Sequence, residues 1–491
     1  MKRPRYSLAR HLAGIVSGPL VAAVVLCCPA PETLGPQGLK GLALVLWIIA
    51  WWVTGAFALP LTSLLGIPLC ILMGILPLPK AISFLGSPTM LIMIGSMFLL
   101  GAMKESRLIE RYTYSMVTSS WVNHSPSKLL VIYGFSVGIL SAIMPNIPVA
   151  ILFTTIAVEL GKSMNAQPGD MLTRALVVCS GAGANLGGGG TPVGGVPNLL
   201  VMGLVASAVH EDIQFWQWSA MGLPLALAWL AAMIVVCWFL YIRRCSQDGS
   251  CISLDVVHDR LKALGPMSRK EKISLFVLVV ALFCWSFGQP VCSFLGLKTL
   301  ASLLNTPFIA IVAGVSLFLI PVGAGEKVSF AMDWKSGVRA VNWDIIIFIA
   351  GALMLGQVMI DSHIDTWLGE LLGGLLTGLS PELVWLTLIV VCAVMAQIIN
   401  PVAVISLLVP MSASFAAQNG LPPVTVSVTV GMSANLAVMF PFSSPPMAAA
   451  LLGSEGYVTS GDFFKVSIPL LIICMMLAWL VGMTLGPLVF R

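Results

Sequence analysis

Two long apolar stretches of this chain are interrupted in a similar way, about 250 positions apart. The first interruption, between Gly187 and Asn198, contains four consecutive glycines and two prolines. The second, between Pro441 and Pro446, contains three prolines and two serines. A helix that breaks inside a membrane leaves backbone groups that are tolerated only within protein or beside a water-filled cavity. Matched breaks in two halves are typical of transporters, whose binding site lies between discontinuous helices.

The composition requires a membrane protein. Hydrophobic residues make up 58% of the chain and charged residues 9%, with a mean hydropathy of +0.99, which leaves too little polar surface for a soluble domain. The stretches Ala175 to Val209 and Leu383 to Ser454 contain no charged residue. The net charge of +5 comes from cations in the connecting segments, so it indicates membrane topology and not a nucleic-acid surface.

The apolar segments predict an all-α polytopic membrane protein with about eleven transmembrane helices, because a crossing needs about 20 apolar residues. Two further stretches, 129–160 and 383–413, are too long for one crossing and too short for two. We expect them to form re-entrant hairpins, each turning at an asparagine next to a proline. Two other segments, 172–208 and 424–453, are expected to be broken helices.

Three residue pairs recur at a similar offset in the two halves: Gly95 with Gly351, Asn146 with Asn400, and Asn185 with Asn435. Each half has an odd number of predicted crossings, so the second copy would be inverted relative to the first. The expected units are an N-terminal span in 1–38, a first repeat over 39–242, a cytoplasmic connector over 243–271 and a second repeat over 272–491. Lys and Arg gather in alternate connecting segments, which predicts a cytoplasmic N-terminus in a plasma membrane, the inner one in bacteria.

Several motifs resemble those of the divalent anion/sodium symporter family. Gly190 to Asn198 is similar to its G-T-x-I-G-[ST]-P-P-N loop, and Phe215 to Pro224 to the F-x-x-W-x-x-x-G-x-P that follows. Trp343 to Phe348 and Gly351 to Gly356 resemble the opening of its second half. The resemblance implies a homodimeric secondary transporter with an elevator-like motion. It would carry a small anion, a di- or tricarboxylate first and sulfate or a similar oxyanion next, with Na⁺ as coupling ion and no other cofactor.

The hairpin tips depart from that family. Family tips resemble Ser-Asn-Thr, whose oxygens help to hold sodium and whose amide and hydroxyl groups meet a carboxylate. Here the tips are Pro145-Asn146-Ile147 and Ile399-Asn400-Pro401, so both asparagines remain and the hydroxyls are replaced. A site that lacks hydroxyl donors offers fewer hydrogen bonds to an anion.

The candidate site residues follow from the breaks and tips. An anion here would be met by neutral groups, namely helix N-termini, amides and hydroxyls, because charged side chains are missing from these stretches. The candidate substrate ligands are Asn146, Asn400, Thr191, Pro192, Ser443 and Ser444. The candidate cation ligands are Asn146, Gly188, Gly190, Asn400 and Asn435, because hard cations prefer oxygen ligands.

Three other functions fit parts of the pattern. An anion exchanger or a proton-coupled carrier could use the same fold, and the lost hydroxyls favour the exchanger. A channel is the second alternative. Gly134-Phe135-Ser136-Val137-Gly138 matches the nucleophile elbow of serine hydrolases, but all five histidines lie at the ends of apolar segments or in loops. An enzyme is therefore not predicted, and the expected partners are the anion, membrane lipid and a second copy of the chain.

Overall fold

The structure is a computed structural model that describes residues 8–31, 33–54, 56–122, 125–243, 254–324, 328–375, 378–441 and 444–490. In these ranges nearly all regular structure is helical, apart from one antiparallel ribbon of β1 (Pro321–Ala324) and β2 (Val328–Phe330). Nine of the described helices are long and apolar enough to cross a membrane. The predicted helical membrane fold is therefore confirmed, and the count of eleven crossings stays a prediction.

The structure contains two close helix pairs, α5 with α17 and α3 with α19. These four helices and three that precede them or lie between them in the chain are α1 (Leu8–Cys27), α2 (Gly35–Thr54), α3 (Leu59–Leu72), α4 (Leu78–Ser83), α5 (Pro88–Glu105), α17 (Thr306–Leu319) and α19 (Trp343–Asp361). Helix α5 packs on α17, and α3 packs on α19. A Cβ added at Gly95 would collide with the Ala310 carbonyl, and one added at Gly351 would collide with Ser63. The repeated glycines therefore allow two helix backbones to approach closely.

Two antiparallel helix pairs turn inside apolar sequence. The first pair is α7 (Pro126–Ile143) and α8 (Asn146–Ser163), and the second is α21 (Pro381–Ile398) and α22 (Pro401–Gln418). Proline begins three of these four helices, a position where its missing N–H costs no helical hydrogen bond. The turn of each pair comes directly before or at the asparagine of the expected tip.

Two other helices stop and resume. Helix α9 (Met171–Gly188) ends in the glycine run and continues as α10 (Val196–Val209). Helix α23 (Pro423–Ser433) passes through the short 3₁₀ turn η4 (Ala434–Leu436), and the chain resumes as α24 (Pro445–Gly453). We name the segments 189–195 and 437–444 the first break and the second break. Helix α10 packs on α22, and α24 packs on α8, so each resumed helix lies against the hairpin of the other half.

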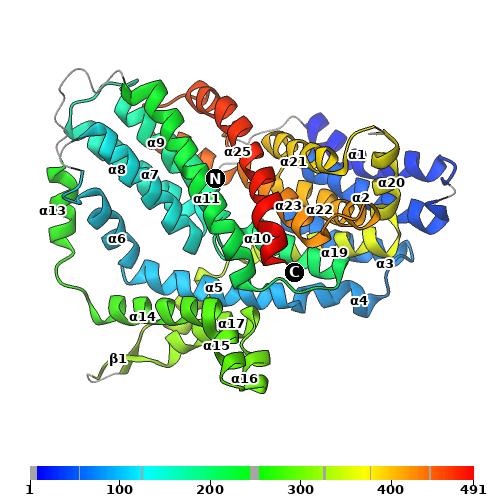
Figure 1. Cartoon of the computed structure of the whole chain (residues 1–491), viewed down its shortest axis with the longest axis horizontal. Helices are drawn as coiled ribbons and strands as arrows, with labels where there is room; N and C mark the ends of the chain where they lie inside the picture. Colours follow the sequence, from blue (N-terminus) through cyan, green and yellow to red (C-terminus); the bar gives the residue numbers. More distant parts are fainter. Residues whose placement is uncertain are drawn as a thin grey trace.

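Two long helices, α11 (Phe215–Cys237) and α25 (Ser460–Val489), lie against each other in the middle of the molecule (Figure 1). Helix α11 contacts α7 and α9, whereas α25 contacts α21 and α23. The Trp229 indole Nε1 donates to the Cys474 carbonyl at 2.9 Å, which links the two helices inside the buried core. In Figure 1 the group with α7, α8 and α9 therefore lies on one side, and the group with α21, α22 and α23 on the other.

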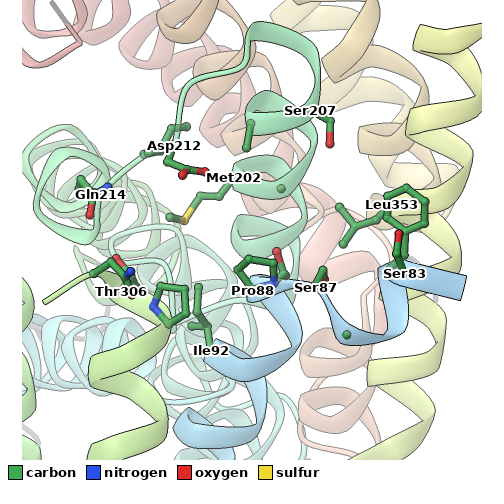
Figure 2. A pocket seen from close by; sticks show the side chains of 18 residues that line it. Ser83, Ser87, Pro88, Ile92, Met202, Ser207, Asp212, Gln214, Thr306 and Leu353 are labelled. Carbon is green, nitrogen blue, oxygen red and sulfur yellow. The ribbon is translucent and has the colours of Figure 1, made fainter. Parts of the chain in front are cut away.

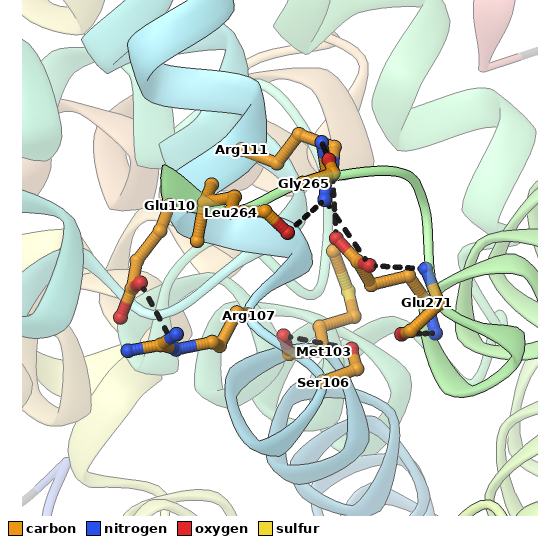
Figure 3. Close-up of polar contacts among 9 residues, drawn as sticks. Met103, Ser106, Arg107, Glu110, Arg111, Leu264, Gly265 and Glu271 are labelled. Carbon is orange, nitrogen blue, oxygen red and sulfur yellow. Dashed lines mark hydrogen bonds and ion pairs between the residues drawn. The ribbon is translucent and has the colours of Figure 1, made fainter. Parts of the chain in front are cut away.

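The remaining elements are short or lie toward one end of the molecule. They are α6 (Leu108–Val117), α13 (Asp255–Ala263), α14 (Arg269–Phe283), α15 (Gln289–Phe294), α16 (Lys298–Leu303), α18 (Trp334–Ala340) and α20 (Ile364–Leu375). Arg111 of α6 donates to Glu271 at 2.6 Å and to the Gly265 carbonyl at 2.9 Å (Figure 3). The Glu271 side chain is only 4% exposed. This ion pair therefore fixes α6, which follows α5 in the chain and precedes α7, to the start of α14.

Candidate functional site

Four helix ends meet at the first break: the C-termini of α7 and α9, and the N-termini of α8 and α10. The last carbonyls of a helix have no partner within the helix. At Gly194 in this break, the position that a Cβ would take lies 2.6 Å from the Gly188 oxygen, 2.8 Å from that of Ser141 and 2.9 Å from that of Ala142. Three carbonyl oxygens therefore converge at a point that only a glycine leaves open.

Asn146 adds its side chain to this group of oxygens. In the amide orientation that satisfies its neighbours, Asn146 Nδ2 donates to the Gly194 carbonyl and to Ser141 Oγ, both at 2.8 Å. The amide oxygen then faces Asn185 Oδ1 at 3.4 Å. Two partly negative oxygens at this distance repel each other unless a positive group lies beside them. A cluster of carbonyl and amide oxygens of this kind suits a small, hard cation.

Asn185 and Asn435 join the two breaks. Asn185 Nδ2 donates to the Ala437 carbonyl and to Ser444 Oγ, each at 2.7 Å. In the opposite direction, Asn435 Nδ2 donates to Asn198 Oδ1 at 3.0 Å. Asn185 precedes the first break and bonds to two residues of the second, whereas Asn435 precedes the second break and bonds to Asn198 in the first turn of α10. The conformation of each break therefore depends on that of the other.

Asn198 completes the network on the first side. Its Nδ2 donates to the carbonyls of Gly188 and Thr191, both at 2.7 Å. The side chain is fully buried, where an unpaired amide would be costly. Asn198 therefore holds the two ends of the first break together.

A different side chain closes the second break. Gln397, near the end of α21, donates from Nε2 to the Leu436 carbonyl at 2.7 Å and to the Ala393 carbonyl at 2.6 Å. Its Oε1 accepts from the backbone N–H groups of Val438 at 3.1 Å and Met439 at 2.9 Å. The side chain is 3% exposed. Gln397 thus pairs the Leu436 carbonyl and the N–H groups of Val438 and Met439 at the start of the second break.

Two cavities lie along α5. The larger, about 520 Å³, is lined by residues of α5, α10 and α19 and by the start of α17, with Ser87, Met202, Asp212 and Thr306 among them (Figure 2). The smaller, about 30 Å³, lies between α5, the first hairpin tip and the first break. That volume corresponds to about one water molecule. The small cavity therefore has no room for an organic anion in this conformation.

An unpaired hydroxyl lines each cavity. Ser87 Oγ beside the large cavity and Ser96 Oγ beside the small one are buried, and neither has a hydrogen-bond partner among the described residues. Buried hydroxyls normally have partners. Ser96 shares its cavity with Gly194 and Gly195 of the first break and with Pro145 of the hairpin tip.

The structure places the candidate residues of the first half as follows. Asn146 and Gly188 lie together, with the Asn146 amide against the Gly188 backbone. Thr191 Oγ1 donates to the Ala142 carbonyl, so this hydroxyl holds the hairpin tip. Pro192 is buried in the turn of the break. Gly190 packs near Leu223 of α11, away from the converging oxygens.

The candidates of the second half are more dispersed. Asn435 and Ser444 take part in the network between the breaks. Asn400 Oδ1 accepts from the backbone N–H of Val402 at 2.9 Å, so this side chain caps α22. Ser443 lies outside the described residues.

Four further polar residues belong to the site: Asn185, Asn198, Gln397 and Ser96. The sequence indicates Asn185, because it matches Asn435 at an offset of 250 residues. Asn198 ends the motif that begins at Gly190. Gln397 and Ser96 have no motif around them, because their surroundings are formed by backbone atoms distant in sequence.

The nucleophile-elbow motif has a structural role. Ser136 lies within the uninterrupted helix α7, whereas an elbow needs a sharp turn between a strand and a helix. Gly134 and Gly138 face Ile234 and Leu230 of α11, where a larger residue would collide. Among the described residues, no group of three or more His, Cys, Asp and Glu side chains is placed to hold a metal ion.

Comparison with known proteins gives consistent results. Residues 44–423 match the family described as Citrate transporter. A sodium-dependent dicarboxylate transporter SdcS of Staphylococcus saprophyticus is 28% identical over 452 residues, which cover 89% of this chain and 84% of the relative. The SdcS of Staphylococcus aureus is 27% identical over 461 residues, with 91% and 86% covered.

Two solved structures share the fold. The YdaH transporter of Alcanivorax borkumensis aligns with a TM-score of 0.55 and 12% identity, over 98% of this chain and 97% of the other. MtrF of Neisseria gonorrhoeae aligns with a TM-score of 0.52 and 12% identity, over 98% and 95%. The resemblance to the divalent anion/sodium symporters is confirmed by the sequence relatives. Because the family model matches well over half of the chain, this protein belongs to the citrate transporter family and is a membrane transporter, not an enzyme.

Proposed function

We propose that this protein is a secondary active transporter that carries a small dicarboxylate or tricarboxylate together with sodium. The anion would be met at the first break by the N-termini of α8 and α10, where free backbone N–H groups favour negative charge. The cation would lie on the carbonyls of Ser141, Ala142 and Gly188 with the Asn146 amide oxygen, at the C-termini of α7 and α9. The observation that carries the proposal is this meeting of four helix ends around Gly194.

Coupling follows from the absence of charged side chains in these stretches. A single ion would be costly to hold here without a counter-ion. An anion and a cation bound side by side lower each other's electrostatic cost. Transport of either ion would therefore depend on the other, as the names of the two SdcS relatives, sodium-dependent dicarboxylate transporters, state for those proteins.

The small volume of the cavity beside the first break supports a binding site that moves during transport. A dicarboxylate can enter only if the first break and hairpin separate from α5, since about 30 Å³ is available between them. We propose that the chain consists of two inverted repeats, 39–242 and 272–491, and that the hairpins and broken helices move past the close pairs α5–α17 and α3–α19 in an elevator-like way. A homodimer, with the N-termini in the cytoplasm of a bacterial inner membrane, would hold the fixed part in place.

An anion exchanger is the second candidate. Its support is the replacement of the tip hydroxyls of the family by Pro145, Ile147, Ile399 and Pro401, which removes oxygen ligands from a sodium site. In this case Asn146 and the carbonyls around Gly194 would hold water in place of sodium.

Uptake into proteoliposomes distinguishes the two. Labelled succinate, malate, citrate, tartrate and sulfate are each offered with and without an inward sodium gradient, and with or without unlabelled anion inside. Uptake driven by sodium into empty vesicles supports the symporter. Uptake that needs internal anion and ignores sodium supports the exchanger and overturns the proposed coupling. Currents that do not saturate with substrate would indicate a channel.

A further inference from the structure

A buried carboxyl group lies where the second hairpin meets a short helix. Asp365, in the first turn of α20, is 6% exposed, and its Oδ2 accepts from Ser414 Oγ of α22 at 2.5 Å. Helix α20 has 12 residues and, among the described helices, is not one of those long and apolar enough to cross a membrane. The Asp365–Ser414 hydrogen bond therefore joins the hairpin to a helix that packs beside it.

The other oxygen of this carboxyl group is unpaired. Asp365 Oδ1 is buried and forms no hydrogen bond with any described residue. An ionised carboxylate away from water is costly unless a cation or several donors face it. Ser414 supplies one donor to Oδ2. The surroundings of Asp365 therefore suit a neutral acid better than a carboxylate.

The helices packed on α20 bring no compensating charge to Asp365 in the part of the chain that the structure describes. These helices are α22, α19 and α2. Helix α22 has no titratable residue. In α19, Asp344 lies at the far end and Asp361 is paired with Lys80 at 2.6 Å. Lys40 of α2 is exposed and forms no ion pair with Asp365.

The titratable neighbours in sequence lie on the surface. His363 precedes α20, Glu370 lies one to two turns further along it, and both are exposed. Burial raises the pKa of the Asp365 carboxyl, and the Ser414 hydroxyl and the His363 imidazole offset only part of that rise. The geometry and the pKa thus agree that a proton binds here more readily than at an exposed aspartate.

We propose that Asp365 is a proton-binding site and that the bound proton stabilises the contact between α20 and the second hairpin. Loss of the proton leaves a buried charge, which favours arrangements in which the carboxylate reaches water. The contact between α20 and α22 would therefore weaken as the pH rises. The site itself goes beyond the proposed function and does not depend on it. Its effect on uptake rests on the proposed movement of the hairpins.

Infrared spectra of the purified, full-length protein test the site directly. Spectra of wild type and Asp365→Asn are compared between about pH 5 and about pH 8.5. Their difference should contain the band of a protonated carboxyl group at low pH and lose it as the pH rises. Glu370→Gln, an exposed position on the same helix, should keep the band of wild type. A carboxylate band at every pH, as a bound metal cation would give, would overturn the inference.

Thermal unfolding in detergent tests the effect on the contact. A carboxyl whose pKa is raised by folding gives stability that is fully present below the unfolded value of about 3.9 and is lost as pH rises through the folded value. The melting temperature of wild type should therefore fall relative to that of Asp365→Asn as the pH rises. A difference between the two proteins that stays constant with pH would contradict the proposal.

Two further variants cover the case in which Asp365→Asn does not fold. Ser414→Ala removes the donor to the ionised form, so the midpoint of the infrared band should move up by about one pH unit. His363 has φ 55°, a conformation that asparagine tolerates, and His363→Asn should retain the band. An unchanged midpoint in Ser414→Ala, or loss of the pH effect in His363→Asn, would overturn the assignment to Asp365.

Uptake into proteoliposomes measures the consequence for transport. Rates of wild type and Asp365→Asn are compared at the same pH, so that titration of the substrate cancels in their ratio. The neutral asparagine should keep the contact at every pH, so the ratio of wild type to variant should rise with pH. A constant ratio would overturn the effect on the hairpin. Absence of uptake by both proteins would contradict the proposed function, while the infrared band would still decide whether Asp365 binds a proton.

Discussion

Asn185 Nδ2 and Ser444 Oγ form a 2.7 Å hydrogen bond that joins the end of the first interrupted helix to the residue that precedes α24. The two residues are far apart in the sequence and fully within the core, at 5% and 4% exposure. Their bond means that neither break can change shape without affecting the other. The conformation of the candidate site therefore depends on both halves of the chain.

The first prediction concerns Asn185. Asn185→Ala leaves the Ala437 carbonyl and Ser444 Oγ without their donor and removes the oxygen that faces Asn146. We expect uptake to be lost and the protein to be destabilised by about 1–3 kcal/mol, the cost of unpaired buried groups. Thermal unfolding in detergent and uptake in proteoliposomes measure the two effects. Asn419→Ala, which loses one local bond at the end of α22, is the control and should retain uptake.

The second prediction separates the two tip asparagines. Asn146→Ala should abolish the stimulation of uptake by sodium, because its amide oxygen faces Asn185 Oδ1 beside the first break, where the proposed cation would lie. Asn400→Ala should leave the sodium dependence unchanged and destabilise the protein by about 1 kcal/mol, the usual effect of a lost helix cap. Sodium titrations of uptake give the comparison. Equal loss of sodium dependence in both variants would contradict this assignment.

The third prediction concerns substrate specificity. Ser96 Oγ is buried beside Gly194 without a partner among the described residues, so Ser96→Ala removes no hydrogen bond to any of them. We expect an unchanged melting temperature and a KM for the anion raised at least roughly tenfold, since one hydrogen bond to an ionised group is worth about 1.5–3 kcal/mol. Ser106→Ala, at the residue directly after α5, whose hydroxyl donates to the Met103 carbonyl of that helix, should change neither KM nor the choice among anions.

The fourth prediction tests whether α5 and α17 form a rigid pair. Gly95→Ala would push a methyl group into the Ala310 carbonyl. Overpacking of this kind costs about 1–3 kcal/mol, so the melting temperature should fall. Gly86→Ala meets nothing within 4 Å and should unfold like wild type. A stable Gly95→Ala protein would show that the two helices can separate.

Much of the fold could be predicted from local sequence. The glycine run before Thr191 and the pair Pro445-Pro446 cannot continue a helix without cost, and the structure interrupts its helices at both places. The matched glycines 95 and 351 proved to be points of close helix approach. These features are local, because one residue type determines each of them.

The site was harder to predict, because backbone atoms form most of it. Every residue carries the same carbonyl and N–H groups, so nothing in the sequence marks Ser141, Ala142 and Gly188 as neighbours. Asn400 and Asn146 occupy matched positions, but Pro401 starts α22 directly after Asn400, and Asn400 caps that helix. Gln397 is one amide in a long apolar run, and three of its four hydrogen-bond partners lie 39 to 42 residues further along the chain.

The large cavity makes the transporter open to inhibition from outside its binding site. Its volume of about 520 Å³ falls in the range that holds drug-sized compounds. It is lined by α5 and the start of α17 as well as by α10 and α19. A compound bound there would hold these helices in their present arrangement. Such an inhibitor should lower the maximum rate of uptake while the KM for the anion stays constant.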